Sequence, residues 1–179
     1  MRFAMMALAL VAAPAAAQEA SFEAFSTGPV FADFGPHAPV EGMLAISPDA
    51  EFAHSFDVAK PADEGTRNRG IESAARFINM HAAAGVDPDN IRVAVVVHGK
   101  AVHDLLAAEA LEAREMPTNG SAAMVADMLS AGVRFIVCGQ SAAAYGVTGE
   151  DLIPGVELAL SAMTAHAQLQ QRGYTVNPF

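Results

Sequence analysis

The sequence contains one cysteine, and its position suits a nucleophile. Cys138 ends the apolar run 133–137 and is followed by Gly139, Gln140 and Ser141. A thiol becomes reactive when a helix N-terminus or a nearby cation lowers its pKa. We therefore expect Cys138 to act as a nucleophile, with Gly139 leaving room beside the sulfur and Ser141 capping a short helix at 142–145.

A second segment that could take part in chemistry follows another apolar run. His98, Gly99 and Lys100 come directly after residues 91–97, which are mostly β-branched. If both runs are neighbouring parallel strands, their carboxyl ends meet at one edge of the sheet, where an imidazole or an ammonium would favour the thiolate of Cys138. The candidate catalytic residues are Cys138 and His98, and the candidate anion-binding residues are Lys100, Gly139, Gln140 and Ser141.

Each of these residues also has a purely structural interpretation. A free cysteine often fills space in a core, a histidine often holds a loop through a carbonyl, and a lone lysine is usually solvated. A metal site of His98, His103 and Cys138 is disfavoured, because histidines five residues apart do not share one helical face, so we expect no metal. Solvated or packed positions are expected for the remaining histidines, His37, His54, His81 and His166.

Several familiar motifs are missing from the sequence. No GxGxxG or Walker loop is present, so we expect no nucleotide cofactor. Residues 139–143 resemble the GxSxG elbow of serine hydrolases except at the last position, where Ala143 replaces glycine. No pair of acidic residues has a spacing typical of a glycosidase.

Length and composition limit the classes of protein further. A chain of 179 residues with 53% hydrophobic residues has room for one domain and is too apolar for disorder. A formal net charge of −10 argues against nucleic acid or an anionic membrane as a partner. One cysteine allows no intramolecular disulfide.

The first 17 residues have the features of a secretory signal peptide. Arg2 precedes the apolar run 3–13, and the small residues 15–17 form an A-x-A pattern before Gln18. The run is short for a membrane-spanning helix, although an uncleaved anchor is the alternative. We therefore expect an exported protein, most simply periplasmic, with no membrane contact after cleavage.

The rest of the chain divides into a lead-in and one regular domain. Residues 18–49 are rich in proline and glycine, with extended or strand segments expected at 30–34 and 43–46. From residue 50 to 179 the hydrophobic pattern alternates between strands and helices, which predicts a three-layer α/β domain with a mainly parallel sheet of about five strands and helices on both faces. The expected strands are 51–58, 91–97, 133–137 and 174–176, and the expected helices lie within 66–84, 101–111, 122–131, 142–145 and 154–172.

An ordered series of motifs accompanies this pattern. It consists of Asn68-Arg69-Gly70-Ile71-Glu72, Ala75-Arg76-Phe77-Ile78-Asn79, Val95-Val96-Val97-His98-Gly99, Ala131-Gly132-Val133, Val137-Cys138-Gly139-Gln140-Ser141, Ser161-Ala162-Met163 and Gln170-x-x-Gly173-Tyr174. With these motifs, residues 50–179 resemble the DsrE-like superfamily (DsrE/DsrF/TusD, YchN-like), in particular its exported branch.

The resemblance implies a compact α/β fold and assembly into homotrimers or homohexamers. In the sulfur-relay members a cysteine carries a persulfide between a donor and an acceptor protein, and only Cys138 corresponds to that position. His98 belongs to a His-Gly motif of the exported branch, and Gly139-Gln140-Ser141 replaces a more apolar continuation. The expected function is a persulfide carrier or sulfurtransferase-like protein; the alternatives are a non-catalytic oligomeric protein that binds a small ligand, and a redox sensor that forms an intermolecular disulfide.

Overall fold

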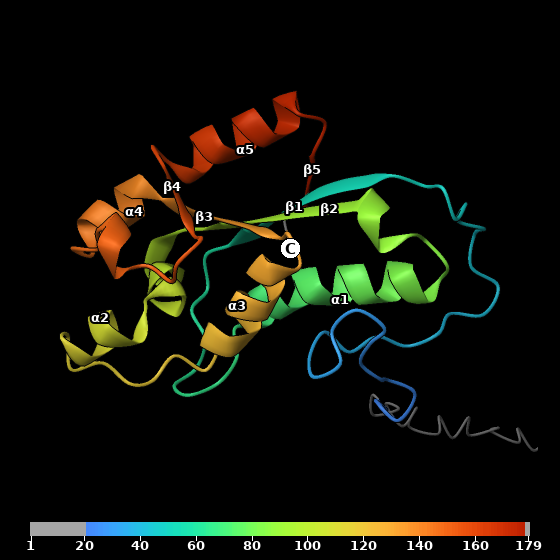
Figure 1. The fold of residues 1–179 in the computed structure, drawn as a ribbon, viewed down its shortest axis with the longest axis horizontal. Coiled ribbons are helices and arrows are strands. Elements are labelled where there is room, and N and C mark those ends of the chain that lie inside the picture. Colours follow the sequence, from blue (N-terminus) through green and yellow to red (C-terminus); the bar gives the residue numbers. More distant parts are fainter. Residues whose placement is uncertain (1–20, 178–179) are drawn as a thin grey trace, which may run out of the picture.

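The sheet has five parallel strands in the order β4-β3-β2-β1-β5 (Figure 1). The structure is a computed structural model and describes residues 21–177. The strands are β1 (Phe52–Val58), β2 (Ile91–Val97), β3 (Arg134–Cys138), β4 (Glu157–Ala159) and β5 (Thr175–Asn177). Each crossover between neighbouring parallel strands passes through helical structure, as the alternating pattern predicts.

Helices cover both faces of this sheet, which confirms the expected α/β architecture. Helices α1 (Arg69–Ala83) and α3 (Ala122–Ser130) lie on one face, and α5 (Ala162–Gln171) lies on the other (Figure 1). Two shorter helices, α2 (Ala108–Glu112) and α4 (Gly139–Ala144), follow β2 and β3. Three 3-10 helices complete the described elements, at Pro88–Asn90, Gly99–Leu105 and Gly149–Asp151.

The two faces of the sheet are packed unequally. On the side of α1 and α3, the large core includes the alternate residues Val93, Val95 and Val97 of β2. On the side of α5 the buried cluster is small and consists of Ala94, Val96, Ile136, Ala165 and Leu169. Because one short helix covers that face, polar side chains beyond the small cluster have room to meet there.

The long helix expected at 154–172 is wrong in its first half. Thr148 and Asp151 form a capping box before this segment, but it begins only the 3-10 helix Gly149–Asp151. Gly155 has a φ of 99°, a left-handed conformation that a right-handed helix cannot include. The chain then runs extended as the edge strand β4, and the helix begins only at Ala162.

Two shorter helices also differ from expectation. Residues 101–111 do not form one helix, because Leu106 makes an antiparallel bridge with Leu152 and separates the 3-10 helix Gly99–Leu105 from α2. Helix α4 begins at Gly139 instead of residue 142, so Ser141 lies inside the helix and is not its cap.

The lead-in is held on α1 by one buried amide. Neither 30–34 nor 43–46 forms a strand. Instead, Asn79 of α1 accepts hydrogen bonds from the backbone N–H groups of Val30 (3.1 Å) and Phe31 (2.8 Å). Its side-chain nitrogen donates to the carbonyl oxygens of Phe31, Phe34 and Gly35. The lead-in therefore packs as an irregular segment, and one side chain satisfies five of its backbone groups.

No helix within residues 21–177 is long and apolar enough to cross a membrane. The expected signal peptide, residues 1–17, lies outside the described residues.

Candidate functional site

Strand register places polar side chains together on the α5 face of the sheet. Asp57 of β1 pairs with Val96 of β2, and Val96 pairs with Ile136 of β3. Alternate residues of a strand share a face, so His98 and Cys138, two residues beyond Val96 and Ile136, lie on the face that carries Asp57. Three neighbouring strands thus carry a carboxylate, an imidazole and a thiol at or next to their carboxyl ends.

These side chains line a cavity of about 360 Å³ at the carboxyl edge of the sheet. Helix α5 and the turn before it form the opposite wall. The lining residues are Asp57, His98, Cys138, Gln140, Ser161, Ala162, Met163 and His166. A crevice at the carboxyl ends of parallel strands is the usual location of a site in this class of fold.

A single carboxylate joins the two histidines of the cavity. Asp57 accepts a hydrogen bond from Nε2 of His98 (3.0 Å) and a second from Nε2 of His166 (2.8 Å). The second ring nitrogen of His166, Nδ1, is 3.0 Å from the hydroxyl of the buried Ser55. Because an ionised carboxylate only accepts hydrogen bonds, both Nε2 atoms carry hydrogen, and a neutral His98 has Nδ1 as an acceptor.

The same contacts keep Asp57 ionised. Burial raises the pKa of this carboxyl, but hydrogen bonds from His98 and His166 outweigh that effect and leave its pKa below the ordinary value.

The Cys138 thiol lies in an environment that favours its anion. The residue is only 6% exposed, and this burial raises the pKa of the thiol. Hydrogen bonds from the Ser141 hydroxyl and from the backbone N–H groups of Ser141, Ala162 and Gln140 outweigh it, so the pKa lies below its ordinary value. The donors come from the first turns of α4 and α5. The helix N-terminus expected beside the thiol is thus among its donors, whereas His98 and Lys100, which were also expected to favour the thiolate, are not.

The expected site residues are divided between this cavity and its surroundings. Cys138, His98 and Gln140 line the cavity, whereas Lys100 lines another pocket together with His103 and Asp104. Lys100 is therefore not among the residues that line the cavity of the thiol. The chain turns into a 3-10 helix directly after His98, which carries it away from the cavity.

Gly139 and Ser141 contribute through packing and hydrogen bonding. A Cβ on Gly139 would lie 2.5 Å from the carbonyl oxygen of Ala159, so only glycine lets α4 begin this close to β4. Ser141 accepts a hydrogen bond from the backbone N–H of Gly99 (2.9 Å) in addition to its contact with Cys138. It therefore ties the ends of β2 and β3 together instead of capping a helix.

The sequence analysis missed Asp57 and His166. Asp57 has a weak local signal, because it is a carboxylate near the carboxyl end of a strand. His166 was expected in a solvated or packed position and is packed; it lies 109 residues from Asp57 in the chain and reaches it because α5 packs on the sheet.

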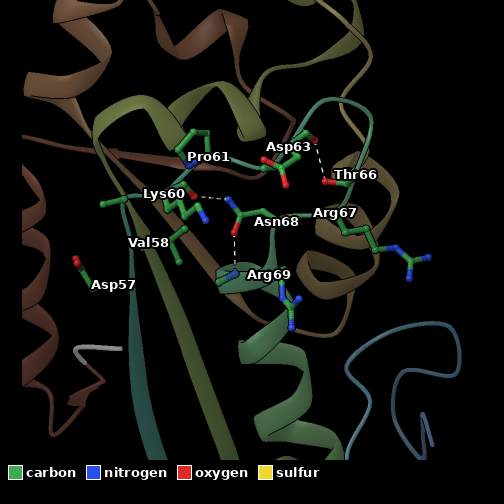
Figure 2. A pocket seen from close by; sticks show the side chains of 12 residues that line it. Asp57, Val58, Lys60, Pro61, Asp63, Thr66, Arg67, Asn68 and Arg69 are labelled. Carbon is green, nitrogen blue, oxygen red and sulfur yellow. Dashed lines mark hydrogen bonds between the residues drawn. The ribbon is translucent and has the colours of Figure 1, made fainter. Parts of the chain in front are cut away.

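A neighbouring pocket lies on the loop between β1 and α1 (Figure 2). Asn68, at its centre, donates to the carbonyl oxygen of Lys60 (2.9 Å) and accepts from the backbone N–H of Gly70 (2.8 Å). Arg67 donates to the carbonyl oxygen of Asp33 (2.8 Å). These contacts serve to start α1 and to hold the loop, and within residues 21–177 no group of three or more His, Cys, Asp or Glu side chains could hold a metal ion there or elsewhere.

The fold and the cavity define a single-domain parallel α/β protein with a thiol at a strand end. Residues 53–178 match the DsrE/DsrF-like family, and the chain belongs to this family. It is also similar to the solved structure of a protein of unknown function, MTH1491 from Methanobacterium thermoautotrophicum, with 21% identity and a TM-score of 0.48 over 71% of this chain and 98% of that chain. No curated protein matches the chain significantly.

Proposed function

We propose that this protein is a sulfur carrier that holds a sulfane sulfur on Cys138 as a persulfide. The observation that carries the proposal is the position of the thiol: it lines a cavity, and hydroxyl and amide donors favour its anion. A cysteine that only filled space would lie among aliphatic side chains without these donors.

The loading step is an exchange at sulfur. The Cys138 thiolate attacks the outer sulfur of a donor persulfide, RSSH, and a new Sγ–S bond forms as the S–S bond of the donor breaks. The electron pair of the broken bond leaves with the RS sulfur, which takes the donor's proton to give RSH. Cys138 then carries a persulfide anion, and attack by an acceptor thiolate on the outer sulfur of the protonated form returns the Cys138 thiolate.

We assign proton transfer to His98. Its Nε2–H is held by Asp57, which orients the ring and leaves Nδ1 to take the proton of the resting thiol. Asp57 acts here as a positioning residue, because it contacts the imidazole and not the reacting sulfur.

We also propose an exported, oligomeric setting for this reaction. The apolar N-terminal run and A-x-A pattern support export to a periplasm, and the family resemblance supports a homotrimer or homohexamer. The sulfur donor and acceptor would be other thiol-bearing molecules of that compartment.

The test is intact-protein mass spectrometry after incubation with an organic persulfide such as cysteamine persulfide. The carrier predicts an adduct of about 32 Da, one sulfur atom, which a thiol reductant removes and Cys138→Ser abolishes. Cys138→Ser is matched by Ser130→Ala on α3, which leaves the thiol in place and should load normally. An unmodified thiol would favour the ligand-binding alternative, and a covalent dimer without the adduct would favour the redox sensor; either result rejects the carrier.

A further inference from the structure

Fixed charge in the Cys138 cavity is negative. Among the eight lining residues, Asp57 is the one carboxylate, and none is lysine or arginine. His98 and His166 are both directed at Asp57 through Nε2 and carry no charge unless protonated. A small anion that enters the cavity therefore meets a carboxylate and no fixed positive side chain.

The lysines and arginines on the loops at this edge of the sheet line other pockets. Lys60, Arg67 and Arg69 line the pocket on the β1–α1 loop, which Asp57 also borders, and Arg67 there is bound to the carbonyl oxygen of Asp33. Figure 2 shows the side chains of Arg67 and Arg69 extending away from Asp57. Lys100 lines a third pocket that it shares with Asp104. The whole chain has a formal net charge of −10, which adds a repulsive field for anions.

Two exposed apolar side chains lie on the segment that forms one wall of the cavity. Leu160 is 72% exposed and Met163 79% exposed, and they flank the lining residues Ser161 and Ala162. The carbonyl oxygen of Leu160 is held by the side-chain amide of Gln140 (3.2 Å), so this segment is tied to the cavity wall. Exposed apolar side chains beside a thiol suit a donor with an organic body better than a hydrated inorganic ion.

We propose that the Cys138 cavity selects its sulfur donor by charge: it accepts sulfane sulfur from uncharged or cationic organic donors and discriminates against inorganic anions such as thiosulfate, with Asp57 as the specificity-determining residue. This selectivity rests on the proposed carrier function. It goes beyond that function by naming the chemical class of the donor.

The Asp57 carboxylate would act on the step in which the thiolate attacks thiosulfate. The Cys138 thiolate would attack the outer sulfur of thiosulfate, the S–S bond would break, and sulfite would leave with the bonding electron pair. Thiosulfate brings two negative charges to a thiolate that already lies near Asp57, so repulsion raises the barrier. A neutral or cationic persulfide brings no such repulsion.

Charge selection can be measured without any sulfur transfer. Cys138 is the single cysteine, so its reaction with methanethiosulfonate reagents reports on this cavity alone. The cationic trimethylammonioethyl reagent and the anionic sulfonatoethyl reagent each place a disulfide on Sγ and release methanesulfinate. The rate constant of each reagent with Cys138 is divided by its rate constant with a free small thiol at the same pH. We expect this normalised rate to be about tenfold higher for the cationic reagent than for the anionic one.

Two variants assign this preference to the cavity. Asp57→Asn should lower the cation-to-anion ratio several-fold, whereas Asp127→Asn, the same change at an exposed position on α3, should leave the ratio unchanged. If Asp57→Asn does not fold, Gln140→Lys adds a cation at an exposed lining position and should lower the ratio in the same direction. An equal or anion-favouring ratio in the native protein, or a ratio that neither folded cavity variant changes, overturns the proposal.

Persulfide loading then separates this proposal from the carrier function. Loading of about 32 Da from cysteamine persulfide but not from thiosulfate supports both. Loading that is faster from thiosulfate keeps the carrier and rejects the charge selection. No loading from either donor rejects the carrier, and with it the donor selection, whatever the reagent ratio shows about the field in the cavity.

Discussion

The Cys138 thiol experiences two opposing effects. Burial disfavours its anion, whereas the Ser141 hydroxyl and the first amides of α4 and α5 favour it, and the second effect is the larger. The donors are backbone groups fixed by helix geometry together with one side chain. The reactivity of the thiol therefore depends on how two helices begin, more than on a neighbouring charged side chain.

Ser141→Ala tests the one side-chain donor among these groups. Removing the hydroxyl should raise the pKa of Cys138, because the thiolate loses a hydrogen bond. The pH profile of the alkylation rate with iodoacetamide should move to higher pH. Ser141→Thr keeps a hydroxyl and should restore the native profile.

Ser130→Ala is the matched control, since the Ser130 hydroxyl binds only a carbonyl of its own helix in α3. If the Ser141→Ala profile superimposed on the native one, the hydroxyl would have no part in stabilising the thiolate.

At the scale of the elements, α5 and the strand before it complete the site. The turn from β4 into α5 brings Ser161 and Ala162 to the thiol, and one turn later α5 brings His166 to Asp57. Ser161 caps α5 by accepting a hydrogen bond from the backbone N–H of Thr164 (3.0 Å). A shift in where this helix starts would move both an amide donor and an imidazole.

Helix α1 has a comparable role for the lead-in. Asn79 is fully buried and satisfies backbone groups of residues 30–35 on both its oxygen and its nitrogen. A Cβ on Gly35 would lie 2.7 Å from the backbone nitrogen of Arg76, so the lead-in approaches the helix as closely as the backbone allows. One amide and one glycine thus hold a segment that has no strand pairing of its own with the sheet.

Asn79→Ala should therefore loosen the lead-in. The change leaves buried backbone N–H and C=O groups without partners, and we expect the free energy of unfolding in urea to fall by about 2–4 kcal/mol. Limited proteolysis should cut within residues 21–49 earlier than in the native protein. Gln168→Ala, an exposed amide on α5, should change stability by less than about 0.5 kcal/mol; an equal loss in both variants would contradict the anchoring role.

At the scale of the whole molecule, one face of the sheet is covered by a single ten-residue helix. Leu158 of the edge strand β4, Leu160 directly after it and Met163 in the first turn of the helix remain exposed. Exposed apolar groups at a short unpaired strand edge are features that association between chains would cover.

We predict that the expected mature chain, residues 18–179, self-associates. At micromolar concentration, size-exclusion chromatography with light scattering should give the mass of a trimer or hexamer, because the family resemblance implies such assemblies. A mass that stays at one chain on concentration would contradict it.

The architecture could be predicted from local patterns. The run 91–97 is β-branched and nearly continuous, which is typical of a strand covered on both faces, and β2 lies at the centre of the sheet. The amphipathic pattern of α1 and its asparagine cap are also local signals. The helix expected at 154–172 begins only at Ala162, because Gly155 has a left-handed φ that a regular helix cannot include.

The sequence by itself determined the α/β class, the central strands and the placement of His98 and Cys138 at a strand end, because hydrophobic periodicity and strand polarity are written in neighbouring residues. Only the tertiary structure decided that Asp57 and His166 join the site and that Lys100 does not. Those outcomes depend on strand register, on the packing of α5 and on the turn after β2, which are contacts between residues far apart in the chain. Local spacing carries no information about which distant side chain a helix brings to a sheet.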